Sequence, residues 1–150
     1  MRRVDKDNIS GLIGLARKAG KVEVGEEAVS VAARHHKARV ILFASDAADN
    51  TLRRQESLGE QGSCPTVILP LTKAELGGSV GRNACALLAI TDIGLAAAVL
   101  KKLPQEEYGD MTGRLERRAE KTYRRRKAQR EKAKAQAKGK PWAPSREQQE

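Results

Sequence analysis

The stretch AGKVEVGEEAVSVAARHHKARVILFASDA, residues 19–47, decides the fold of this chain. It begins with a glycine turn, alternates polar and apolar residues over 21–24, and then starts a helix at Gly25 with apolar positions at helical spacing. The run 40–44 contains no polar residue, which is typical of a strand buried on both faces. A strand, a helix and a buried strand in this order predict an α/β domain.

The same alternation of helices and strands continues outward from this stretch. Helices are expected over about 8–18, 26–35, 49–58, 72–78 and 93–103, and strands over 21–24, 40–44, 66–69 and 86–90. The expected helix starts are Asp7 or Asn8, Asp46 or Asp49, a capping box from Thr72 to Glu75, and Thr91 or Asp92. Gly59 and Gly62 are expected to end the third helix. These elements predict a three-layer α/β/α sandwich around a small mixed four-stranded sheet.

The chain is expected to divide into a folded domain, 1–104, closed by Pro104, and a basic low-complexity tail, 105–150. Residues 1–104 hold 15 Lys and Arg against 11 Asp and Glu, whereas 105–150 hold 14 against 8. The composition of 105–113 predicts a linker. Good helix formers without a wide apolar stripe fill 114–137, which predicts a helical or disordered arm, and 139–150 is expected to be disordered.

Composition points to an anionic partner. The net charge is +10 and aromatic residues make up 3%, so phosphate contacts are favoured over base stacking. Two cysteines are too few for a disulfide framework, the N-terminal residues lack the apolar run of a signal peptide, and the apolar run 84–90 is too short to cross a bilayer. We therefore expect a soluble cytoplasmic protein that does not associate with a membrane, and we expect it to be a monomer.

Catalytic motifs are missing from the sequence. It contains no Walker loop, dinucleotide fingerprint or nucleophile elbow, and we expect no cofactor and no bound metal. An enzyme that uses Asp46, Asp49 and a metal ion is the weakest alternative, because helix capping explains both aspartates more simply.

Binding residues are expected at the ends of several elements. Lys21, the helix start at Gly25, and the pair Arg82 and Asn83 could converge on one rim of the sandwich, where the backbone N–H groups of Gly25 and Glu26 would meet phosphates. Two readings stay open beside this one. The cations could be ordinary solvated charges, or the rim could contact a protein partner.

The segments 12–47, LGGSVGRNACALLAIT (76–91) and DIGLAAAVLKK (92–102) resemble the kink-turn-binding ribosomal protein family of the L7Ae/L30e type, and within it the bacterial YlxQ-like branch. The resemblance covers roughly residues 7–103. It implies an α/β/α sandwich without catalytic activity that binds structured RNA, with ribosomal RNA and ribosomal proteins as expected partners. In that family the second helix start and the loop before the last strand grip the bent RNA.

Carried onto this chain, the resemblance implies the following RNA-binding positions: Lys21, Gly25, Glu26, Glu27, Ala28, Val31, Gly81, Arg82, Asn83 and Ala84. Three of them depart from the family pattern. Glu27 stands in place of Asn or Lys, Ala28 in place of Glu or Gln, and Val31 in place of Lys. We therefore expect weaker kink-turn binding than in the family. The function implied is that of a ribosome-associated or ribosome-biogenesis factor.

Overall fold

The computed structural model describes residues 5–139, which build one mixed sheet. Its four strands are β1 (Val22–Val24), β2 (Val40–Phe43), β3 (Thr66–Ile68) and β4 (Leu87–Ile90). Their order across the sheet is β1-β4-β2-β3. Strand β4 pairs antiparallel with both β1 and β2, whereas β2 pairs parallel with β3. The predicted mixed four-stranded sheet is confirmed, with β1 at one edge and β3 at the other.

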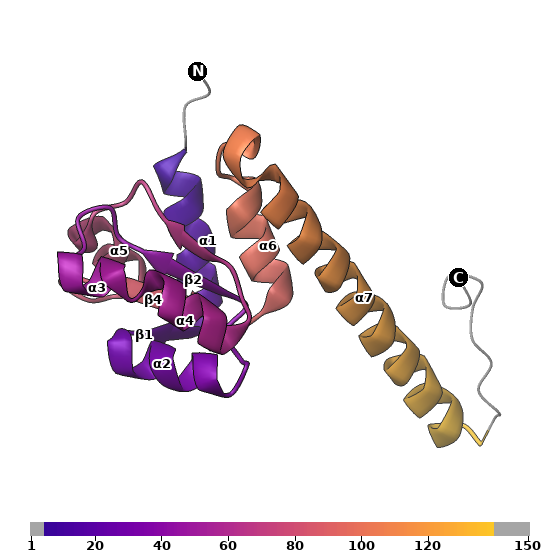
Figure 1. Cartoon of the computed structure of the whole chain (residues 1–150). Helices are drawn as coiled ribbons and strands as arrows, with labels where there is room; N and C mark the ends of the chain where they lie inside the picture. The colour runs from indigo at the N-terminus through magenta and orange to yellow at the C-terminus, as the bar shows by residue number, and fades with distance from the viewer. Residues whose placement is uncertain (1–4, 140–150) are drawn as a thin grey trace.

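Helices cover both faces of this sheet (Figure 1). Over the described residues they are α1 (Lys6–Lys18), α2 (Glu26–Arg34), α3 (Asp49–Arg53), α4 (Gln55–Gly62), α5 (Lys73–Ser79), α6 (Ile93–Lys101) and α7 (Gln105–Ala137). Apolar residues of α1, α5 and α6 share one core cluster, and those of α2 and α4 share the other. The chain is therefore the α/β/α sandwich that its sequence predicts.

Strand β2 separates the two core clusters. Its four residues are all fully buried, and they alternate between the faces: Val40 and Leu42 pack under α1, α5 and α6, whereas Ile41 and Phe43 pack under α2 and α4. A strand with apolar side chains on both faces is stable only between two helix layers. The apolar run in the sequence therefore anticipated the three-layer arrangement.

Helix starts follow the predicted chemistry at some positions and not at others. The capping box of Thr72 and Glu75 is present, and the carboxylate of Asp92 accepts from the N–H of Leu95 at 2.9 Å. The first helix is capped by Asp5, whose carboxylate accepts from the N–H of Asn8 at 3.2 Å, so the predicted caps Asp7 and Asn8 are wrong. Asp5 lies three residues before the unpaired N–H of Asn8, so its carboxylate satisfies this donor from an earlier position than the predicted caps.

The helix predicted over 49–58 is in fact two short helices, α3 and α4, which meet at Arg54. Neither Asp46 nor Asp49 caps it, because the cap position belongs to Ala48, which makes no side-chain hydrogen bond there. Of the two glycines expected to end the helix, Gly59 lies inside α4, whereas Gly62 is its last residue, as predicted. Leu58 of α4 is fully buried in the cluster shared with α2, and this packing outweighs the weak helix propensity of Gly59.

The segment predicted as a linker forms the first turns of α7. Pro104 precedes that helix, and Thr112 and Leu115 are buried against the α1, α5 and α6 layer. The side-chain amide of Gln105 also donates to the carbonyl oxygens of Leu100 and Leu103, at 3.0 and 2.7 Å. The compact part therefore continues past Pro104, and the helical alternative for the tail is the observed one. The predicted disorder of 139–150 falls, apart from Gly139, outside the described residues.

A groove with a volume of about 1090 Å³ separates the first half of α7 from α4. Cys64 lies in it, between the two helices. Burial raises the pKa of the Cys64 thiol from 9.0 to about 11, and the positive charges of Arg118 and Arg39 oppose this shift. The thiol therefore stays neutral in the folded chain at pH values where an exposed thiol is ionised.

The raised pKa of Cys64 predicts a loss of stability at high pH. Above pH 9 the unfolded chain releases this proton while the folded chain keeps it until about pH 11, so the free energy of unfolding falls as the pH rises through this range. Urea denaturation at pH 8.0 and pH 10.5 measures the effect. The difference in stability between the native chain and Cys64→Ala should shrink at the higher pH, and an unchanged difference would contradict this assignment.

Candidate nucleic-acid interface

Helix α2 starts at a glycine with a positive φ angle, a backbone conformation that residues with a Cβ atom rarely adopt. Gly25 is the N-cap of α2 with a φ of 94°, and no side chain caps the helix. The first N–H groups of an α-helix have no partner inside the helix, so those of residues 26–28 are left for an outside acceptor. The N–H of Gly25 itself donates to the carbonyl oxygen of Leu87 at 3.2 Å. The prediction that the N–H of Gly25 meets a phosphate is therefore wrong, because this N–H is used to join α2 to β4.

The loop 81–86, which precedes β4, folds back onto α5. The N–H of Arg82 donates to the carbonyl oxygen of Gly77 at 2.8 Å. A Cβ atom at Gly77 would lie 2.8 Å from the backbone of Ala84, so only glycine permits this approach. Arg82, Asn83 and Ala84 are exposed. The guanidinium of Arg17 lies against Gly81 and adds a cation to the loop.

Two segments that are far apart in the sequence meet at one end of the sheet. The hydrogen bond from Gly25 to Leu87 places the start of α2 beside the start of β4, which the loop 81–86 enters. The N–H of Ala44 donates to the carbonyl oxygen of Ala86 at 2.8 Å, which adds the end of β2 to the same place. We call residues 25–28 together with 81–86 the α2 edge.

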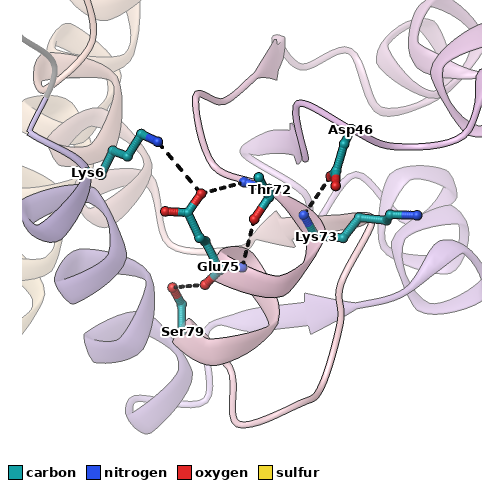
Figure 2. A network of polar contacts seen from close by, with 6 residues as sticks. All are labelled: Lys6, Asp46, Thr72, Lys73, Glu75 and Ser79. Atoms are coloured by element: carbon teal, nitrogen blue, oxygen red, sulfur yellow. Dashed lines mark hydrogen bonds and ion pairs between the residues drawn. The ribbon is translucent and has the colours of Figure 1, made fainter.

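Polar contacts hold α5, and with it the loop, in place (Figure 2). Asp46 accepts a hydrogen bond from the N–H of Lys73 at 2.7 Å, so it caps α5 and not the helix that follows it in sequence. Thr72 and Glu75 exchange hydrogen bonds of 3.2 and 3.0 Å. The N–H of Thr72 lowers the pKa of Glu75, and Lys6, whose Nζ lies 3.7 Å from the carboxylate, lowers it further.

Two acidic residues lie where an anion would approach α2, and Arg54, at the junction of α3 and α4, neutralises one of them. The carboxylate of Glu26 forms an ion pair with Arg54, which also donates to Ser30 Oγ at 3.4 Å. Glu27 is exposed. Sequence reasoning missed Arg54, because nothing in the pattern links two residues 28 positions apart. The ion pair leaves Glu27 as the acid that opposes a phosphate at this helix start.

The family resemblance predicts RNA at this helix start, and replacing Glu27 by glutamine should then tighten that binding severalfold. The substitution removes one negative charge beside the uncapped N–H groups and keeps a good helix former. Glu56→Gln, at an exposed position of α4, changes the net charge by the same amount and should have a smaller effect. Affinity for a stem with an internal loop, measured by fluorescence anisotropy at fixed salt, compares the two variants. Equal gains would mean that net charge alone is responsible.

The structure does not bring Lys21 to the α2 edge. The carbonyl oxygen of Lys21 accepts from the N–H of Thr91, at the opposite end of β1 from Gly25. Lys21 and Gly25 are four residues apart along an extended chain, so their Cα atoms lie about 13 Å apart. Of the remaining predicted positions, Ala28 is half-buried and the Val31 side chain is 39% exposed on α2. The loop and the helix start converge as predicted, whereas the lysine does not.

Two negative findings concern the described residues. Within residues 5–139, no group of three or more His, Cys, Asp or Glu side chains is arranged to hold a metal ion. No helix in that part of the chain is both long and apolar enough to cross a membrane.

Comparison with known proteins gives one family. Residues 7–100 match the model of the ribosomal protein L7Ae/L30e/S12e/Gadd45 family. The chain is 33% identical over 96 residues to the RNA-binding protein YlxQ of Bacillus subtilis, covering 61% of this chain and 91% of the relative. It is 30% identical over 82 residues to the RNA-binding protein YlxQ of Enterococcus faecium, covering 55% and 79%.

Solved structures share the fold at lower identity. A protein of unknown function from Bacillus halodurans superposes with a TM-score of 0.55 at 24% identity, covering 61% of this chain and 95% of that one. The 15.5 kDa RNA-binding protein of Giardia lamblia superposes with a TM-score of 0.54 at 16% identity, covering 73% and 85%.

Proposed function

The chain belongs to the ribosomal protein L7Ae/L30e/S12e/Gadd45 family, and on that premise we propose that it is a non-catalytic RNA-binding protein that recognises structured, kink-turn-like RNA. The observation that supports this proposal is the α2 edge, where an uncapped helix start and an exposed loop are joined through the hydrogen bond from Gly25 to Leu87. The relatives named as RNA-binding proteins support the same class of ligand.

The α2 edge offers contacts of two kinds. The N–H groups of residues 26–28 would donate to phosphate oxygens at a sharp bend of the RNA backbone, where the helix dipole also favours negative charge. Arg82 and Asn83 project from the loop as donors for sugar or base edges, and Arg17 adds a cation beside them. Backbone donors and two polar side chains suit recognition of RNA shape more than of sequence.

The proposed partners rest on the family to which the chain belongs. We infer that ribosomal RNA is the principal ligand, that ribosomal proteins are neighbours in the complex, and that the chain acts as a monomer in ribosome association or biogenesis. Nothing at the α2 edge requires a cofactor, and the proposed role involves no bond-breaking step.

Crosslinking in cells followed by sequencing of the bound RNA tests the proposal. We expect enrichment of ribosomal RNA at internal-loop bends, and we expect that enrichment to fall for the double variant Arg82→Ala/Asn83→Ala. The matched control is Lys101→Ala/Lys102→Ala, an exposed pair away from the α2 edge. Absence of RNA enrichment, together with protein partners that survive nuclease treatment, would favour a protein-interaction module.

A further inference from the structure

The second half of α7 extends beyond the body of the domain (Figure 1). Helix α7 packs on the core through Thr112, Leu115 and Ala119, and after this point most of its large side chains are exposed, as Tyr123 is at 59%, while Lys127 and Glu131 are half-buried. Residues 123–137 span about 22 Å at 1.5 Å per residue. A helix that leaves the core in this way is stabilised little by packing, so its composition must suit another environment.

Charge dominates this exposed half. Residues 121–138 carry one acid, Glu131, and nine cations: Lys121, Arg124, Arg125, Arg126, Lys127, Arg130, Lys132, Lys134 and Lys138. Because successive residues are 100° apart, these cations surround the helix and do not gather on one face. An interfacial membrane helix needs an opposite apolar face, and a coiled coil needs an apolar seam. The even distribution instead suits a polyanion whose phosphates can be contacted from any side of the helix, as the backbone of an RNA duplex can.

The basic half of α7 leaves from the end of the sheet opposite to the α2 edge. Strand β4 runs from Leu87, beside Gly25, to Ile90, after which α6 begins. Asp92 and Gly94 at the start of α6 share a shallow groove with Thr122 and Arg126 of α7. Figure 1 shows α3 and α5 on the side of the sheet away from the free end of α7. One RNA bend seated at the α2 edge would therefore leave this helix free for other contacts.

We propose that the basic half of α7 binds the phosphate backbone of an A-form RNA helix, separate from the RNA at the α2 edge, so that one chain holds two RNA segments at once. The proposal rests on the proposed function for the first segment only. The α7 contact is electrostatic and independent of sequence, so it depends steeply on salt, whereas backbone donors at the α2 edge depend on the shape of the RNA.

A bridging experiment with the full chain tests this inference. A biotinylated stem with an internal loop is immobilised, the chain is bound to it, and a fluorescent, fully paired 16-bp RNA duplex is added. We expect the duplex to be retained by the native chain. The double variant Arg125→Gln/Arg126→Gln keeps helix propensity and should bind the duplex roughly tenfold more weakly, with the slope of log affinity against log salt reduced by about 2.

Matched controls separate the two proposals. Lys101→Gln/Lys102→Gln removes the same charge outside α7 and should leave bridging unchanged. Duplex binding that weakens only in the α7 variant, without any preference for the internal loop, would support the α7 contact while contradicting the proposed function. The inference would be overturned if both variants weakened duplex binding equally, or if one RNA displaced the other. It would also be overturned if binding to anionic phosphatidylserine vesicles depended on α7 while duplex binding did not.

Discussion

Replacing Gly77 by alanine is expected to lower the affinity for internal-loop RNA about tenfold, which corresponds to the loss of one or two hydrogen bonds. A Cβ atom there would lie 2.8 Å from backbone atoms of Ala84 and from the carbonyl oxygen of Arg82, and backbone cannot move aside as a flexible side chain can. The loop must shift away from α5, which displaces Arg82 and Asn83 relative to the start of α2. We also expect the free energy of unfolding to fall by about 1–3 kcal/mol through overpacking.

Gly78 provides the matched control for this substitution. It is the next residue of the same helix, it is exposed, and a Cβ atom on it would meet nothing within 4 Å. Gly78→Ala should therefore leave RNA affinity unchanged and raise stability by about 0.5–1 kcal/mol, because alanine favours the helix. Urea denaturation and fluorescence anisotropy on both variants measure the two effects. Equal behaviour of the two variants would contradict the account of the loop.

The second large effect is expected from removing α7. A chain that ends at residue 104 loses the buried side chains of Thr112 and Leu115 and uncovers Leu100. Removal of a buried leucine side chain alone typically costs about 2–5 kcal/mol, a large part of a domain stability of about 5–15 kcal/mol. We expect this chain to unfold at much lower urea concentration than the full chain, or to be unfolded without urea.

A chain that ends at residue 122 is the control for this deletion. It keeps Thr112, Leu115 and Ala119 and lacks most of the exposed basic half, so its unfolding midpoint should lie close to that of the full chain. Its RNA affinity should be lower at low salt and should fall less steeply as salt is raised. A stable, cooperatively folded 1–104 chain would show that the first half of α7 does not belong to the folding unit.

Much of the fold was predictable because local patterns carried it. The all-apolar run at β2 required helices on two faces, and the box of Thr72 and Glu75 located a helix start within one residue. The first turns of α7, residues 105–113, were predicted as a linker because their apolar residues Tyr108 and Met111 lie among glycines and acids, although both are at helical spacing from Leu115. Composition outweighed periodicity in that segment, and the periodicity was the better guide.

The candidate site was predictable in position but not in detail. The start of α2 and the loop 81–86 could be placed from their glycines and from the order of elements. The ion pair of Glu26 with Arg54 and the approach of Arg17 to Gly81 depend on tertiary packing between helices, which no local pattern encodes. Lys21 was misplaced because a short strand has two ends, and the sequence alone did not say which end meets the loop.

Amide chemical shift perturbation can show residue by residue whether RNA contacts the α2 edge. The full chain, labelled with ¹⁵N, is titrated with a stem that contains an internal loop, at a salt concentration that suppresses non-specific binding. We expect the largest shift changes to fall on residues 26–28 and 82–86, with smaller ones along the basic half of α7. Changes confined to α7, with the amides of the α2 edge unmoved at saturation, would contradict this expectation.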